Sequence, residues 1–78
     1  MKVSCNIDKS RLALEFENGE NDSRIIYIKG FYGTETFTVK SHDFYERSDM
    51  SEQEKEAALK EIEAFNEKNP YQIILMDD

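Results

Sequence analysis

Apolar side chains recur at every second residue through the early part of the chain, and this period of two is typical of half-buried β-strands. In the first segment, Val3, Cys5 and Ile7 alternate with polar residues. Three more segments either repeat this alternation or are rich in β-branched and aromatic residues. The four predicted strands cover 2–7, 11–17, 24–29 and 34–40.

One helix is predicted to begin at Ser51. Ser51 and Glu54 have the spacing of a capping box, in which each side chain accepts a hydrogen bond from a backbone N–H at the helix start. Ala58, Ile62 and Phe65 follow at the i, i+4, i+7 spacing of one helical face. This narrow apolar stripe is sufficient to cover one face of a sheet.

The helix is expected to end before Pro70, because the residue preceding a proline is pushed out of helical geometry. Tyr71–Met76 then reads as a last strand. We therefore predict a single α+β domain over residues 1–78 with the order ββββαβ, an antiparallel sheet of four to five strands with one helix packed on one face. Besides the helix stripe, the predicted core contains Leu14, Phe16, Ile26, Ile28, Phe37, Val39, Ile73 and Leu75.

The charge balance narrows the classes of partner. Seventeen acidic residues against ten basic ones leave a net charge of −7. Binding to nucleic acids and to anionic membranes needs clustered lysine and arginine, so we predict neither. The chain has no apolar run of membrane-spanning length, no signal-peptide pattern and a single cysteine, which together predict a cytoplasmic protein.

No motif for catalysis or cofactor binding is found. The sequence contains neither a phosphate-binding loop nor a dinucleotide-binding fingerprint. With one histidine and one cysteine it cannot assemble an ordinary structural zinc site. Cys5 and His42 could in principle form a nucleophile and its base, but nothing in the sequence places them together. We predict no enzyme activity, no catalytic residues, no cofactor and no metal.

Two segments are candidates for binding a protein partner. The first is the segment 15–22, which contains four acidic residues with no basic residue between them and could attract a basic protein. The alternative is that these acids only form a solvated surface without a binding role. The second is the connection at 41–50, where aromatic residues and an arginine are typical interface anchors. Its aromatic pair could instead close the open end of the sheet. The predicted partner-binding residues are Glu15, Glu17, Glu20, Asp22, Phe44, Tyr45 and Arg47.

The order of these features resembles that of small bacterial immunity proteins, which neutralise polymorphic toxins. The resemblance spans roughly residues 11–76 and rests on four segments. They are a strand end at Tyr27–Gly30, an aromatic connection at Ser41–Tyr45, a helix opening at Ser51–Lys55 and a closing strand at Tyr71–Met76. It implies a cytoplasmic inhibitor that binds one cognate toxin and has no catalysis of its own.

The sequence therefore predicts a small acidic binding protein that inhibits a cognate, basic protein partner. Two alternatives remain open. Phage-encoded inhibitors of host proteins share the small size, the acidity and the lack of motifs. A non-catalytic accessory domain could also act through homodimerisation at an open sheet edge, so the chain could be a monomer or a homodimer.

Overall fold

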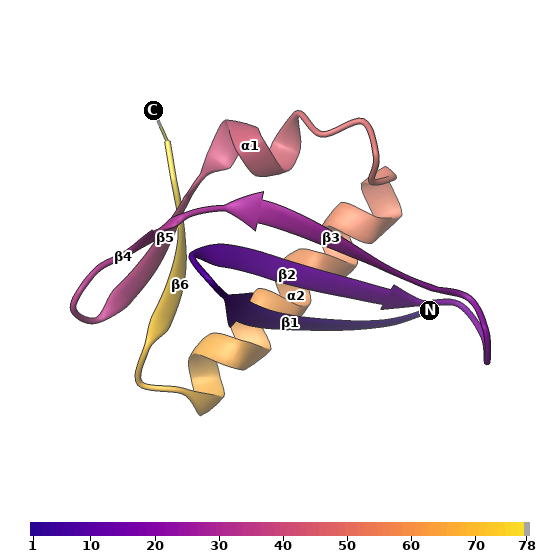
Figure 1. The fold of residues 1–78 in the computed structure, drawn as a ribbon, viewed down its shortest axis with the longest axis horizontal. Coiled ribbons are helices and arrows are strands. Elements are labelled where there is room, and N and C mark those ends of the chain that lie inside the picture. The colour runs from indigo at the N-terminus through magenta and orange to yellow at the C-terminus, as the bar shows by residue number, and fades with distance from the viewer. Residues whose placement is uncertain (78) are drawn as a thin grey trace.

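The computed structural model describes residues 1–77, which form six strands and two helices (Figure 1). The α+β class predicted from the sequence is confirmed. In chain order the elements are β1 (Lys2–Asp8), β2 (Arg11–Glu17), β3 (Ser23–Lys29), β4 (Phe31–Tyr32), β5 (Thr36–Lys40), α1 (Ser41–Tyr45), α2 (Glu52–Lys68) and β6 (Gln72–Met76).

The strands form two sheets instead of the single antiparallel sheet predicted. The first has the order β1-β2-β3 and is antiparallel throughout. The second has the order β4-β5-β6, in which β4 and β5 are antiparallel but β5 and β6 are parallel. Parallel neighbours need a long crossover connection, and here the two helices provide it. The chain leaves β5, passes through α1 and α2, and returns as β6 beside β5 in the same direction. Figure 1 shows the two sheets crossing at a steep angle.

The core lies between the first sheet, the second sheet and α2, which contacts both β1 and β6. The predicted core is largely confirmed, with Phe65 and Leu75 half-buried and the other predicted residues buried. The capping box of α2 is also confirmed: Glu54 N–H donates to Ser51 Oγ at 3.1 Å, and Ser51 N–H donates to Glu54 Oε1 at 2.8 Å. No helix within residues 1–77 is long and apolar enough to cross a membrane.

The connection at 41–50, predicted to be irregular, begins with the short helix α1 and places Phe44 in the core. Phe44 is 0% exposed, so its predicted role in contacting a partner is wrong for this structure. The physical reason is that α1 follows β5 directly, which carries the apolar ring onto the same core as Phe37 and Val39. Lys55 of α2 holds the other end of α1, since its Nζ donates to Tyr45 O at 2.7 Å.

Gly30 lies where the chain passes from β3 into β4. Its N–H donates to Ser10 O at 3.0 Å, which ties this junction to the turn between β1 and β2. A Cβ at this position would lie 2.6 Å from Cζ of the buried Phe37 ring and 2.8 Å from the carbonyl oxygen of Thr38. The close approach of the two sheets therefore depends on a residue with no side chain.

An ion pair joins the first sheet to the start of α2. Arg24 donates through Nη1 and Nη2 to the two oxygens of Glu54, at 2.7 and 2.9 Å, and Nη2 also donates to Asp49 O at 2.7 Å. The Arg24 hydrogen bond, followed by the backbone N–H of Ser51, lowers the pKa of Glu54 to about 2. Glu54 therefore serves both the helix cap and the contact with β3.

Replacement of Glu54 by glutamine is expected to lower the free energy of unfolding by about 1 kcal/mol at pH 7, because glutamine keeps the cap but loses the charge. A carboxylate with a depressed pKa stabilises the fold above its unfolded-state pKa, here 4.5, and loses that contribution as the pH falls towards 2. The difference between the two proteins should therefore shrink from pH 5 to pH 2. Urea denaturation at several pH values measures it, with Glu63→Gln on the exposed face of α2 as the control. A difference that is constant with pH would contradict the assignment.

Candidate functional site

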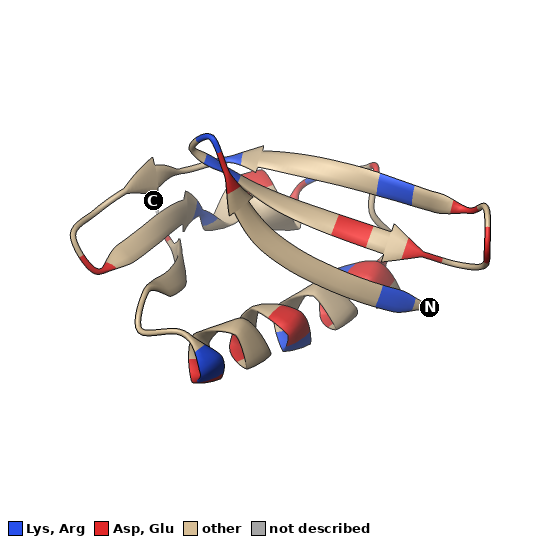
Figure 2. Cartoon of the chain, turned by 60° about the horizontal axis from the view of Figure 1, so that its bottom comes forward, with Lys and Arg blue, Asp and Glu red and all other residues tan. Residues whose placement is uncertain are grey.

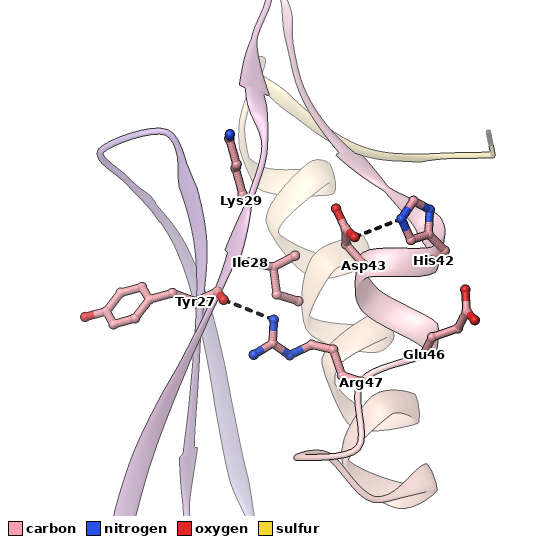
Figure 3. Close-up of a pocket in the computed structure, with 7 residues that line it drawn as sticks. All are labelled: Tyr27, Ile28, Lys29, His42, Asp43, Glu46 and Arg47. Carbon is pink, nitrogen blue, oxygen red and sulfur yellow. Dashed lines mark hydrogen bonds and ion pairs between the residues drawn. The ribbon is translucent and has the colours of Figure 1, made fainter.

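A pocket of about 580 Å³ lies between the free edge of β3 and α1 (Figure 3). β3 is an outer strand of the first sheet, and α1 stands alongside its C-terminal end. One wall comes from β3 and the other from α1 and the two residues after it. The lining residues are Tyr27, Ile28, Lys29, His42, Asp43, Glu46 and Arg47.

The polar groups of this pocket are engaged largely with one another and with the loop that follows. Arg47 donates through Nε and Nη2 to Asp49, at 2.9 and 2.8 Å, and through Nη1 to the carbonyl oxygen of Tyr27 at 3.3 Å. The hydrogen bond to Asp49 raises the pKa of Arg47. Nε2 of His42 lies 3.0 Å from Oδ1 of Asp43. The predicted binding residue Arg47 thus clamps the 46–51 loop to the edge of β3.

Cys5 and His42, the pair considered for nucleophilic catalysis, have separate surroundings. Cys5 lies on β1, where its Sγ is 3.5 Å from the carbonyl oxygen of Glu61 on α2. Burial, with a smaller effect from Glu61, raises the pKa of this thiol to about 11, so it is protonated at neutral pH. Cys5 does not line the pocket that contains His42.

The four predicted acids gather at one end of the first sheet (Figure 2). Glu15 and Glu17 alternate with the buried Leu14 and Phe16, so they point from the outer face, which is the face opposite α2. Glu20 is exposed in the loop that joins β2 to β3, as is Asp22. The structure therefore brings the acidic residues together, as their spacing along the sequence suggested.

The same outer face carries exposed apolar side chains that sequence reasoning missed. Ile25 is 49% exposed and lies opposite Glu15 in the strand register, while Tyr27 is 40% exposed and lies opposite Ala13. The guanidinium carbon of Arg11 lies 3.9 Å from the centre of the Tyr27 ring. A signal was available in the sequence, because placing Ile26 and Ile28 in the core requires their odd-numbered neighbours to face outward.

Tyr45 does not join this arrangement. Its side chain is 49% exposed and lies on α1, with its ring centre 5.1 Å from that of Phe44 in an edge-to-face contact. Figure 1 shows α1 over the far end of β3, away from the 18–22 loop that carries Glu20 and Asp22. The acids and the aromatic anchor predicted from the sequence thus occupy different parts of the surface.

Comparison with known proteins finds no relative. The chain matches no protein-family model, no curated protein and no solved structure. The outer face of β1-β2-β3 and its chemistry are therefore the basis on which a function is assigned.

Proposed function

We propose that the protein binds and inhibits a cognate protein with a basic surface, such as a toxin, through the outer face of the first sheet. The observation that carries the proposal is the strand register, which sets exposed Ile25 beside Glu15 and places Tyr27 one row further along. An open face with an apolar centre and an acidic end has the composition of a protein-binding surface.

The two parts of this face contribute differently to binding. The acidic end attracts a basic partner over a distance, which mainly raises the association rate and is screened within about 8 Å at physiological salt. Burial of Ile25 and Tyr27 supplies contact energy and slows dissociation. The net charge of −7 adds to the attraction of a basic partner.

The resemblance to immunity proteins supports the inhibitory role. An inhibitor of this kind needs affinity and a rigid contact surface, and it needs no chemistry of its own. Strands β2 and β3 supply such a surface, because Glu15, Ile25 and Tyr27 are all held on hydrogen-bonded strands.

The partner can be identified by placing a photo-crosslinking amino acid at position 25 in the source cells, with position 63 on the exposed face of α2 as the control. The proposal requires a basic protein that crosslinks at position 25 only and whose activity the purified chain suppresses. Crosslinking at both positions, or at neither, would contradict it.

Loss of the acidic charges is expected to slow association with that partner and to make the association rate less dependent on salt, with dissociation little changed. The variant for this test carries the corresponding amide at Glu15, Glu17, Glu20 and Asp22. Tyr27→Ala should instead speed dissociation. If the ring is a hot spot, the loss of binding free energy should be about 2 kcal/mol. Surface-based binding kinetics at two salt concentrations measures both effects. Tyr45→Ala is the matched control, and faster dissociation from Tyr45→Ala alone would move the binding surface to α1.

Homodimerisation is a second candidate function, favoured by the position of β6 at the edge of its sheet and by its solvent-exposed apolar side chains. This strand is the outer member of its sheet, and its Ile74 and Met76 are large apolar side chains open to solvent. Part of its free edge is already occupied, because the Asn66 side chain binds the N–H of Ile73 at 2.7 Å and its carbonyl oxygen at 2.9 Å. Sedimentation at micromolar concentration tests the idea, and a monomer would argue against it.

A further inference from the structure

The outer face of the first sheet has a basic end as well as an acidic one. Arg11 at the start of β2 lies directly opposite Lys29 at the end of β3, and both side chains are on the same face as Glu15. Between the two ends lies the row formed by Ala13 and Tyr27. Along β2 the order is therefore basic, apolar, acidic.

The charges at each end are only partly balanced by the neighbouring strand β1, where Asp8 lies opposite Arg11 and Lys2 lies opposite Glu17. Like charges directly opposite on neighbouring strands destabilise a sheet, and Arg11 with Lys29 is such a pair. Arg11 has an ion pair with Asp8 at 3.2 Å, whereas Lys29 has no ion pair among residues 1–77. At the other end, Glu15 and Glu17 stand on the same face of β2, and although Lys2 lies opposite Glu17 in the register, neither acid has an ion pair inside the described part of the chain.

Unfavourable local charge arrangements are expected where a sequence serves binding as well as folding. A partner with a cationic group at the acidic end and a carboxylate at the basic end would relieve both arrangements at once. Such relief adds to the burial of Ile25, which lies opposite Glu15, and of Tyr27, which lies in the row between the two ends.

We infer that the partner is held in one orientation by two opposite charge contacts, with its cationic group on Glu15 and Glu17 and a carboxylate group on Lys29 and Arg11. This inference rests on the proposed function and adds the second contact to it. Strands rise by about 3.3 Å a residue, so the two groups of the partner are spaced by about 13–20 Å, with an apolar contact between them.

The direction in which one substitution changes the binding affinity distinguishes this inference from simple attraction between opposite net charges. Lys29→Met makes the protein more acidic, so general attraction would strengthen its binding to a basic partner. If Lys29 contacts a carboxylate, the same change should weaken binding about fivefold to tenfold, mainly through faster dissociation. Lys60→Met, on the exposed face of α2, removes the same charge away from the site and should not weaken binding.

The experiment measures binding kinetics of the protein captured by crosslinking at position 25, against the parent chain, Lys29→Met and Lys60→Met. Oligolysine serves as a second probe, since it has no side-chain carboxylates and should bind the Lys29→Met variant at least as tightly as the parent. The captured partner could bind Lys29→Met as tightly as the parent or more tightly, while the variant with amides at the four acidic positions still associates slowly. That result would overturn the orientation and leave the proposed function standing. An amide variant that associates at the parental rate, or the absence of a crosslinked partner, would overturn both.

Discussion

Replacement of Phe44 by alanine is expected to lower the free energy of unfolding by about 3–5 kcal/mol, a large part of what a domain of this size has. The ring is fully buried and belongs to the same cluster as Phe37, Val39 and Met50. Its loss leaves a cavity, and it removes the only fully buried side chain with which α1 contacts the core within the described residues.

Tyr45→Ala is the matched control for this prediction, because it removes an aromatic ring from the adjacent position of the same helix. Tyr45 is half-exposed, so we expect a loss of less than about 1 kcal/mol. Urea denaturation followed by circular dichroism measures both variants. If Phe44→Ala is too unstable to purify, the milder Phe44→Leu should still cost more than Tyr45→Ala, and equal losses would show that α1 does not pack as described.

A second large loss is expected from Gly30→Ala, at about 2–3 kcal/mol or more. The added methyl group would meet the buried Phe37 ring and the backbone oxygen of Thr38, neither of which can move without disturbing β5. The reason is lack of space at the junction of the two sheets, so the effect should depend on the size of residue 37.

A double-mutant cycle tests that explanation. Phe37→Leu alone creates a cavity, but it also frees room beside residue 30, so combining it with Gly30→Ala should cost less than the sum of the two single changes. Thermal and urea denaturation of the four proteins provides the coupling energy. Strict additivity would show that the Phe37 ring is not what excludes a side chain at position 30.

The strands of the first sheet and helix α2 could be predicted from the sequence because their signals are local. Alternation placed Leu14 and Phe16 in the core, and the spacing of Ser51 and Glu54 identified the start of α2. The pairing of β5 with β6 could not be predicted in this way, because a period of two reports which side of a strand is buried and does not report its neighbour. α1 and β4 are too short for any periodicity to be seen.

The candidate site was predicted in part for the same reason. The acids are close in sequence, so their gathering at one end of the sheet followed from a single hairpin. Phe44 was misassigned because its charged neighbours are typical of a surface loop, whereas its burial depends on β5 lying immediately before α1. The nearness of Ile25 to Glu15 depends on the register between two strands, which the sequence pattern does not specify.

The crossover between β5 and β6 has a consequence for the order of events during synthesis. The strands of the first sheet are all made early and are neighbours along the chain, so they can pair while translation continues. Phe37 on β5 lies opposite Ile73 on β6, and both helices lie between the two strands in the sequence. One edge of β5 therefore stays unpaired on the nascent chain until the β6 residues have left the ribosome, and in that interval it is open to chaperones and to other unfinished chains.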